Sequence, residues 1–131
     1  MQKSDCIFCK IVKGEIPSYK LWEDKNFYAF LDINPMQSGH TLLIPKVHHD
    51  YVFDVDDPLY SELFRTAKNL SVKLKKATHA KKIALAIEGI STPHVHLHLV
   101  PVNNINDLDP CLSKKADPKE LERLAKVIKE K

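Results

Sequence analysis

Three histidines alternate with apolar residues in residues 92–101, Thr-Pro-His-Val-His-Leu-His-Leu-Val-Pro. An alternation of period two, rich in Val and Leu and bounded by prolines, predicts a β-strand whose successive side chains point to opposite faces. His94, His96 and His98 then share one face, about 6.5 to 7 Å apart along the strand. The other face is ordinary apolar core. One face of the strand is therefore expected to be packed, and the face with the three histidines is the candidate for chemistry.

The spacing of the three imidazoles allows two kinds of chemistry. Either two of them bind one metal ion with a carboxylate from elsewhere, or one acts as nucleophile or base while its neighbours orient it and a substrate. A solvated strand face with coincidental histidines is the third interpretation, and three histidines in register argue against it.

Composition narrows the class of protein. The chain has 131 residues, 44% of them hydrophobic, which suits one globular domain with an adequate core. A formal net charge of +3 is too small to indicate nucleic acid or an anionic membrane as the main partner. No apolar run approaches the ~18 residues of a spanning helix, and charges stand where a signal peptide needs apolar residues. We therefore expect a cytoplasmic protein.

Cys6 and Cys9 form a Cys-x-x-Cys pair near the start of the chain, and Cys111 is isolated. Three cysteines make no disulfide framework, and in a reducing compartment such a pair more often binds metal or performs redox chemistry. Zinc would need two further ligands, and a thioredoxin-like role would need a preceding strand that the sequence lacks. Buried cysteines that act as small hydrophobic residues are the remaining alternative.

The rest of the pattern predicts about five strands and two helices. Besides the histidine strand, strands are expected at 19–22, 27–31, 39–46 and 83–87, and helices at 57–78 and from 117 onward. Strands grouped before and after one long helix indicate an α+β fold with an antiparallel sheet, one long central helix and a C-terminal helix.

Three polar residues outside the histidine strand are ambiguous. Asp32 precedes Ile-Asn-Pro, where an aspartate normally caps a turn through its own backbone. His40 enters a predicted strand after Gly39, and His48 follows the end of that strand. A single loop histidine is usually only solvated, although either one could reach a site.

Together these segments resemble the histidine triad (HIT) family. Residues 94–100 match its signature of three histidines separated by apolar residues, and three earlier segments match successive blocks of the Hint-like branch: 6–17, 29–35 and 39–48. The likeness runs from about residue 5 to residue 101 in family order. It implies a single HIT-like domain over residues 1–131, with a core at about 5–101 and a C-terminal extension at about 102–131.

The resemblance implies a hydrolase or transferase that acts at the α-phosphate of a purine nucleotide, on phosphoramidate, acyl-nucleotide or dinucleoside polyphosphate substrates. By position, His96 would be the nucleophile and form a nucleotidyl-histidine intermediate. A neutral imidazole in that role needs an acceptor for its second nitrogen and donors near the phosphate oxygens. His98 and Ser91 match phosphate-contacting positions, and His40 matches a position near the leaving group. The base and ribose pocket is implied at Phe8, Ile16, Phe30, Asp32 and Ile33, with Asp32 receiving the ribose hydroxyls.

The resemblance also implies a metal and a partner. In several bacterial-type members two N-terminal cysteines, a histidine after Pro-Lys-x and the first histidine of the triad bind zinc, which here means Cys6, Cys9, His48 and His94. Two thiolates and two imidazoles would make a closed, structural tetrahedral site that braces the N-terminal segment against the histidine strand. Family members commonly form homodimers through an extended sheet, and we expect the same here.

Two departures from the family pattern keep other functions open. Ile87-Glu88-Gly89 stands where the family often has Asn-x-Gly, and the loop before His94 is shorter and lacks a Gly-Gln pair. A nucleotide-binding or interaction module with vestigial catalysis is therefore the alternative function. A third hypothesis is a metalloenzyme that uses the three strand histidines directly, for which no carboxylate has an evident ligand role.

Overall fold

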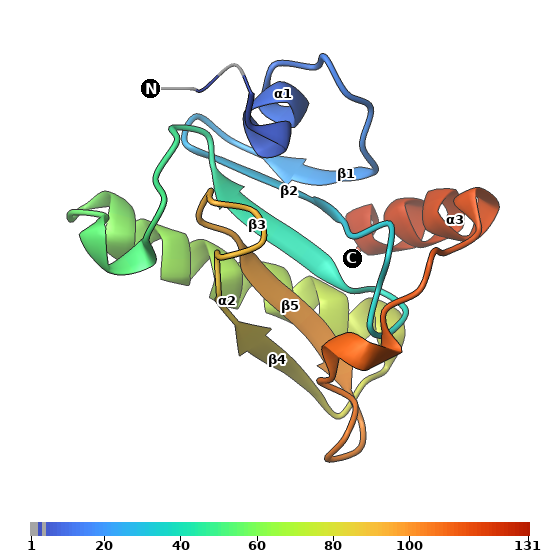
Figure 1. Ribbon diagram of the computed structural model, residues 1–131. Helices are drawn as coiled ribbons and strands as arrows, with labels where there is room; N and C mark the ends of the chain where they lie inside the picture. Colours follow the sequence, from blue (N-terminus) through green and yellow to red (C-terminus); the bar gives the residue numbers. More distant parts are fainter. Residues whose placement is uncertain (1–2, 4) are drawn as a thin grey trace.

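In the computed structural model, which describes residue 3 and residues 5–131, five strands form one sheet (Figure 1). The strands are β1 (Lys20–Glu23), β2 (Phe27–Leu31), β3 (Thr41–Pro45), β4 (Lys82–Ala86) and β5 (Leu97–Val102). Their order across the sheet is β1-β2-β3-β5-β4, and every neighbouring pair is antiparallel. The predicted α+β class with a five-stranded antiparallel sheet is thus confirmed.

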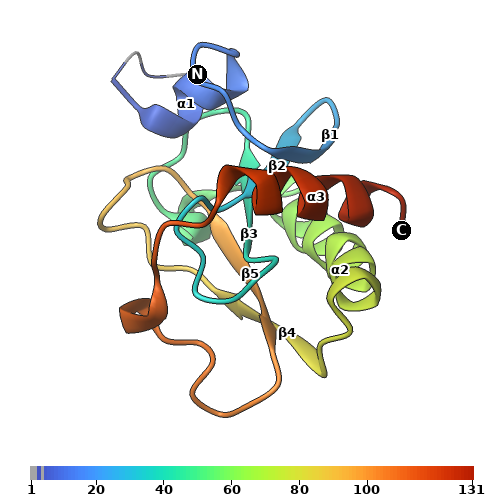
Figure 2. The same ribbon diagram turned by 90° about the vertical axis from the view of Figure 1, so that its right-hand side faces the viewer.

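Helices cover both faces of this sheet (Figures 1 and 2). The helices of the described residues are α1 (Ile7–Val12), α2 (Leu59–Thr78) and α3 (Pro118–Lys129), with short 3-10 turns η1 (Val52–Asp54) and η2 (Pro110–Leu112). Helices α2 and α3 pack against each other on one face, and α1 packs on the other through Phe8 and Ile11. None of these helices is both long and apolar enough to cross a membrane.

Local sequence explains where the central elements begin and end. In the turn between β1 and β2, the Asp24 carboxylate accepts hydrogen bonds from the backbone N–H groups of Asn26 and Phe27, at 2.8 Å each. Helix α2 follows Asp57, whose carboxylate accepts from Ser61. The apolar positions of α2 recur every three or four residues and are buried at Leu63, Ala67, Leu70 and Leu74.

The sheet separates two cores. Strands β2 and β3 are buried along their whole length, as continuous apolar strands covered on both faces should be. The larger core lies between the sheet and helices α2 and α3, and α3 contributes Leu121, Leu124, Ala125 and Ile128 to it. The smaller core lies beneath α1 and consists of Phe8, Ile11, Tyr28, Phe30, Leu42 and Ile44.

The histidine strand is shorter than the alternation predicts. Strand β5 begins only at Leu97, so His94 and His96 lie in an irregular segment before it. Two backbone hydrogen bonds explain the difference: His94 N–H donates to Thr92 at 2.8 Å, and Val95 N–H donates to His49 at 2.7 Å. These donors are directed to loops and not to a neighbouring strand. Helix α1, for which the sequence pattern gave no prediction, is a second difference.

Candidate functional site

A cavity of about 340 Å³ opens on the face of the sheet that carries α1. Its size is typical of small-ligand sites. The residues expected at the base, ribose and phosphate all line it, and so do two of the triad histidines: Phe8, Ile16, Phe30, Asp32, Ile33, Ser91, His96 and His98. Loops and elements far apart in the chain supply these side chains, so the fold brings the expected nucleotide-binding residues together.

His96 is oriented by a single backbone contact. Its Nδ1 lies 2.7 Å from the carbonyl oxygen of His94. Because a carbonyl oxygen can only accept, the neutral imidazole carries its proton on Nδ1 and keeps a lone pair on Nε2. The side chain is only 4% exposed, and its ring lies edge-on to Phe8 with centroids 4.9 Å apart. This arrangement leaves a buried ring nitrogen with a free lone pair in a fixed orientation.

A chain of hydrogen bonds assigns the tautomers of the other two site histidines. The backbone N–H of Met36 donates to His40 Nδ1 at 3.0 Å, so neutral His40 carries its proton on Nε2. That Nε2 lies 2.9 Å from His98 Nδ1 and donates to it. His98 must then carry its own proton on Nε2. An N–H donor is thereby fixed beside His96 in the cavity wall.

Burial keeps these imidazoles neutral. Desolvation, assisted by the neighbouring His96 and His40, lowers the pKa of His98 to about 4. Desolvation also lowers the pKa of His40, and the carboxylate of Asp32 opposes that shift. Both rings are therefore uncharged near pH 7, which agrees with the tautomers assigned from their partners.

Asp32 combines the turn role with a place in the cavity. Its Oδ1 accepts a hydrogen bond from the backbone N–H of Asn34 at 2.8 Å, which is the turn expected from the sequence. Its Oδ2 lies 3.6 Å from His40 Nε2, and the residue lines the cavity. The turn therefore holds one carboxylate oxygen and aims the other toward the site.

Ser91 lies in the shortened loop, and its hydroxyl is already engaged. It donates to Glu88 Oε1 at 3.4 Å, and Glu88 Oε2 accepts from the backbone N–H of Ile90 at 3.1 Å. The neighbouring Thr92 also lines the cavity, as does Leu42, which pairs with His98 across β3 and β5. Sequence reasoning missed both residues, because only the strand register reveals Leu42 and only the loop's course reveals Thr92.

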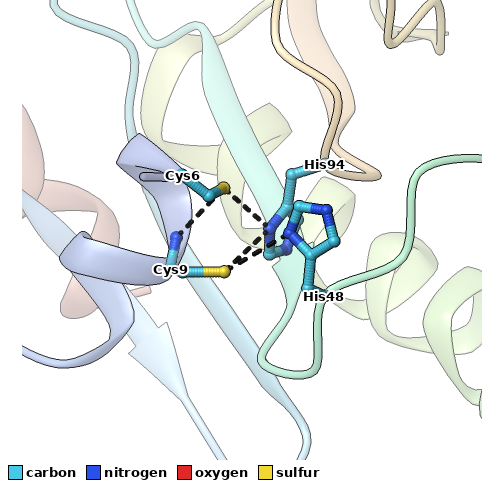
Figure 3. Close-up of side chains that lie close together, drawn as sticks. All are labelled: Cys6, Cys9, His48 and His94. Atoms are coloured by element: carbon cyan, nitrogen blue, oxygen red, sulfur yellow. Dashed lines mark hydrogen bonds between the residues drawn. The ribbon is translucent and has the colours of Figure 1, made fainter. Parts of the chain in front are cut away.

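Two thiols and two imidazoles converge beside the cavity (Figure 3). His94 Nδ1 lies 3.3 Å from Cys6 Sγ and 3.5 Å from Cys9 Sγ, and His48 Nδ1 lies 3.4 Å from Cys9 Sγ. A tetrahedral zinc ion with ordinary bond lengths separates sulfur and nitrogen ligands by about 3.5 Å. The donor set and its spacing therefore fit zinc, and the four residues are those that the family resemblance implies.

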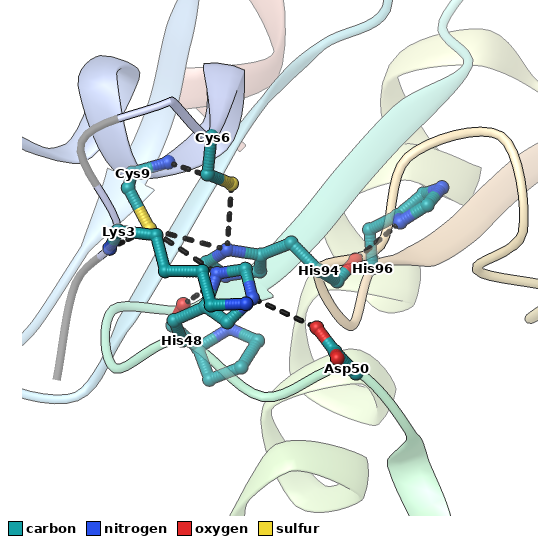
Figure 4. A network of polar contacts seen from close by, with 8 residues as sticks. Lys3, Cys6, Cys9, His48, Asp50, His94 and His96 are labelled. Carbon is teal, nitrogen blue, oxygen red and sulfur yellow. Dashed lines mark hydrogen bonds and ion pairs between the residues drawn. The ribbon is translucent and has the colours of Figure 1, made fainter.

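The outer nitrogens of this cluster support metal binding (Figure 4). His94 Nε2 donates to the carbonyl oxygen of Pro45 at 2.9 Å, and His48 Nε2 donates to Asp50 Oδ1 at 2.8 Å. Because the Pro45 carbonyl and the Asp50 carboxylate each hold the proton of their histidine on Nε2, the Nδ1 lone pairs of His94 and His48 are directed at the thiols. This arrangement is typical of metal-binding histidines. Burial lowers the pKa of His94 to about 4, so its ring is neutral as a ligand must be.

A second group of possible ligands, Asp32, His40 and His98, does not fit a metal. A metal on His40 Nε2 would force the proton onto Nδ1, where the Met36 N–H already donates. Two donors would then face each other. The triad histidines also do not converge on one point, because His94 faces the thiols while His98 faces His40.

The fold is α+β, and its antiparallel sheet carries a small-ligand cavity lined by His96 and His98 beside a Cys₂His₂ cluster. This combination defines a narrow class of protein. Residues 13–105 match the family model of the HIT domain. The chain therefore belongs to the histidine triad family.

Relatives with known sequences agree with this assignment. A HIT-like protein of Borreliella burgdorferi is 39% identical over 104 residues, which cover 74% of this chain and 75% of that protein. Adenosine 5'-monophosphoramidase HNT1 of Saccharomyces cerevisiae is 44% identical over 97 residues, 73% of this chain and 61% of the yeast protein. Adenylylsulfatase HINT3 of Arabidopsis thaliana is 32% identical over 104 residues, 76% of this chain and 53% of the plant protein.

Solved structures extend the likeness to nearly the whole chain. A Hit-like protein from Bartonella henselae superposes with a TM-score of 0.88 at 29% identity, covering 98% of this chain and 96% of that one. A zinc-bound histidine triad family protein from Mycobacterium smegmatis superposes with a TM-score of 0.81 at 30% identity, covering 96% and 91%. The zinc is a property of the mycobacterial structure.

Proposed function

We propose that this protein is a purine nucleotide hydrolase or transferase that cleaves at the α-phosphate, with His96 as the nucleophile. One observation carries the proposal: the 2.7 Å hydrogen bond to the His94 carbonyl fixes the His96 tautomer and leaves Nε2 with a lone pair at the cavity wall. The names of the yeast and plant relatives, a monophosphoramidase and an adenylylsulfatase, support adenosine nucleotide chemistry.

The cavity suggests how a nucleotide would lie. The purine would pack against the apolar side chains of Phe8, Ile16, Phe30 and Ile33, and Asp32 would accept hydrogen bonds from the ribose hydroxyls. The α-phosphate would then lie between His96 and His98. His98 Nε2–H is the donor available to a non-bridging oxygen, and Ser91 contributes only if its hydroxyl leaves Glu88.

The reaction follows from these positions. His96 Nε2 attacks phosphorus and forms an N–P bond, while the bond from phosphorus to the leaving group breaks. The leaving group departs with the electron pair and takes a proton from solvent. The phosphorylated ring becomes a cation whose Nδ1–H remains bonded to the His94 carbonyl. A water molecule then attacks phosphorus and loses a proton to solvent, the N–P bond breaks with its electron pair returning to Nε2, and nucleoside monophosphate leaves with His96 neutral again. His40 positions His98 through their shared hydrogen bond.

Zinc held by Cys6, Cys9, His48 and His94 would supply a closed structural cross-link, since four protein ligands leave no open position for water. A reducing compartment such as the cytoplasm keeps both thiols available. We also expect the homodimer implied by the family.

The test is release of AMP by the purified protein from adenosine phosphoramidate, AMP-lysine, ADP and diadenosine polyphosphates. His96→Ala should reduce release by more than about 10³-fold, as loss of a nucleophile does. His79→Asn is the matched control, because His79 is an exposed histidine at the end of α2, and it should leave the rate unchanged. Retained release by His96→Ala would contradict the proposal.

The alternative function has its own support in the structure. The hydroxyl of Ser91 is bonded to Glu88 in the shortened loop, which removes one expected phosphate donor. AMP binding without release from any of the four substrate classes would favour a nucleotide-binding module with vestigial catalysis.

A further inference from the structure

Helix α1 belongs to two sites at once. Cys6, its N-cap, and Cys9 face the thiol–imidazole cluster, whereas Ile7, Phe8 and Ile11 line the cavity. Side chains of one short helix therefore form both a wall of the proposed nucleotide pocket and half of the proposed metal site. Any displacement of α1 changes both.

Intrinsic helix stability cannot hold α1 in place. The helix has six residues, and isolated helices shorter than about 12 residues are marginal in water. Its position depends on the apolar contacts of Phe8 and Ile11 with the smaller core and on the two thiols. A metal that joins those thiols to His48 and His94 would attach α1 to the loop after β3 and to the segment before β5.

His94 links the same cluster to the nucleophile. Its side chain faces the thiols, and its carbonyl oxygen accepts the hydrogen bond from His96 Nδ1 (Figure 4). The ring of Phe8 lies edge-on to both histidines, with centroids 5.8 Å from His94 and 4.9 Å from His96. The orientation of His96 therefore depends on a residue whose other end would bind the metal.

We infer that metal binding at Cys6, Cys9, His48 and His94 and nucleotide binding in the cavity favour each other. This inference rests on the proposed nucleotide function and extends it: the metal cluster is a positioning site for the pocket and not only a support for the fold. Thermodynamic linkage requires the coupling to be reciprocal, so the factor by which zinc tightens nucleotide binding is also the factor by which nucleotide tightens zinc.

Binding of AMP tests the coupling without turnover. The dissociation constant for AMP is measured by calorimetry with the full chain loaded with zinc and again after zinc is removed by a chelator. We expect AMP to bind about 5 to 50 times more weakly without zinc, within the usual range of allosteric coupling. The reverse arm measures zinc affinity by competition with a chromophoric chelator, with and without saturating AMP, and the same factor should appear.

Phe8→Ala tests whether the coupling passes through the contacts of the Phe8 ring with His94 and His96. This variant keeps all four metal ligands and removes the ring that joins α1 to His94 and His96, so zinc should still bind while the coupling factor falls toward one. Phe53→Ala is the matched control, because Phe53 is 66% exposed and lies outside the cavity lining. Its coupling factor should equal that of the unmodified protein.

The outcomes separate this inference from the proposed function. Equal AMP affinity with and without zinc would overturn the coupling and leave the proposed function intact. Absence of AMP binding in both states would overturn the proposed function and the coupling with it. Circular dichroism checks that the zinc-free chain is folded. If it is not, the zinc-affinity arm decides with folded, zinc-loaded protein, and a zinc affinity insensitive to AMP overturns the coupling.

Discussion

His98 is partly buried and neutral near pH 7 in the folded protein, and this makes stability depend on pH. An unfolded histidine has a pKa near 6.5, whereas desolvation lowers the pKa of His98 to about 4 in the fold. Between pH 6.5 and 4 the unfolded chain binds the proton and the folded chain does not. The contribution of His98 to the free energy of unfolding must therefore fall as the pH drops from 6.5 to 4. Above pH 6.5 this contribution is fully present.

The variant His98→Asn should remove the part of this dependence that His98 contributes, while His40 and His94, whose pKa values burial also lowers, keep theirs. An asparagine oxygen can accept the hydrogen bond from His40 Nε2 as His98 Nδ1 does, but it cannot be protonated. Urea unfolding at pH 7 and pH 4.5 should show that the unmodified protein loses about 1 to 2 kcal/mol more than the variant, a value reduced from 1.36 kcal/mol per pKa unit for partial solvent access. Equal losses would refute the role of His98.

Single residues also show how far sequence reasoning reaches. The turn at Asp32 was evident from Asp-Ile-Asn-Pro, and the structure contains it. The approach of its second oxygen to His40 was not evident, because it depends on the hairpin that brings residue 40 back beside residue 32. The tautomers were inaccessible for the same reason, since each is assigned by a backbone group such as the Met36 N–H or the Pro45 carbonyl.

Periodicity predicted the elements well where one pattern persisted. Strand β2 has the predicted bounds, and α2 ends at Thr78 as its apolar spacing indicates. Helix α1 has no such signal because it spans under two turns, and its N-cap is the cysteine thiol, which accepts from Cys9 N–H. Local order there follows from tertiary packing and not from a sequence pattern.

The end of α2 offers a test at the scale of one element. His79 caps the helix in the left-handed conformation, at φ 58° and ψ 23°, with its N–H donating to Lys75. Glycine adopts this conformation without the steric cost of a Cβ atom. His79→Gly should therefore raise the free energy of unfolding by about 0.5 to 1 kcal/mol in urea titrations. His79→Ala removes the same imidazole but keeps Cβ, and a gain of equal size in that variant would exclude the conformational explanation.

Contacts between residues far apart in the sequence could not be predicted from residue spacing alone. Cys9 and His94 stand 85 positions apart, and in the sequence only the family resemblance assigns them to one site. Likewise, α3 lies beyond the HIT-domain match at residues 13–105, yet Leu121 and Ile128 pack into the larger core. The amphipathic spacing predicted helix α3, but it could not predict which core the helix packs into, because that depends on the whole fold.

The two edges of the sheet differ in their suitability for a dimer. Strand β1 has an irregular register between Lys20 and Trp22 and carries charges at both ends. Strand β4 pairs regularly with β5 along its whole length, and no other described strand pairs with its outer side. Its Leu85 is 44% exposed. An unpaired regular edge is a template for another strand, so β4 is the edge through which we expect two copies to join.

Sedimentation equilibrium tests this expectation. The unmodified chain of 15.0 kDa should sediment at twice its mass at micromolar concentration. Leu85→Glu should dissociate the pair, because antiparallel pairing about a two-fold axis would bring two carboxylates close together and desolvate them. Ile105→Glu adds the same charge at a loop position that is 97% exposed, and it should remain dimeric. A dimer that survives Leu85→Glu would place the contact elsewhere. A monomeric unmodified protein would exclude the dimer.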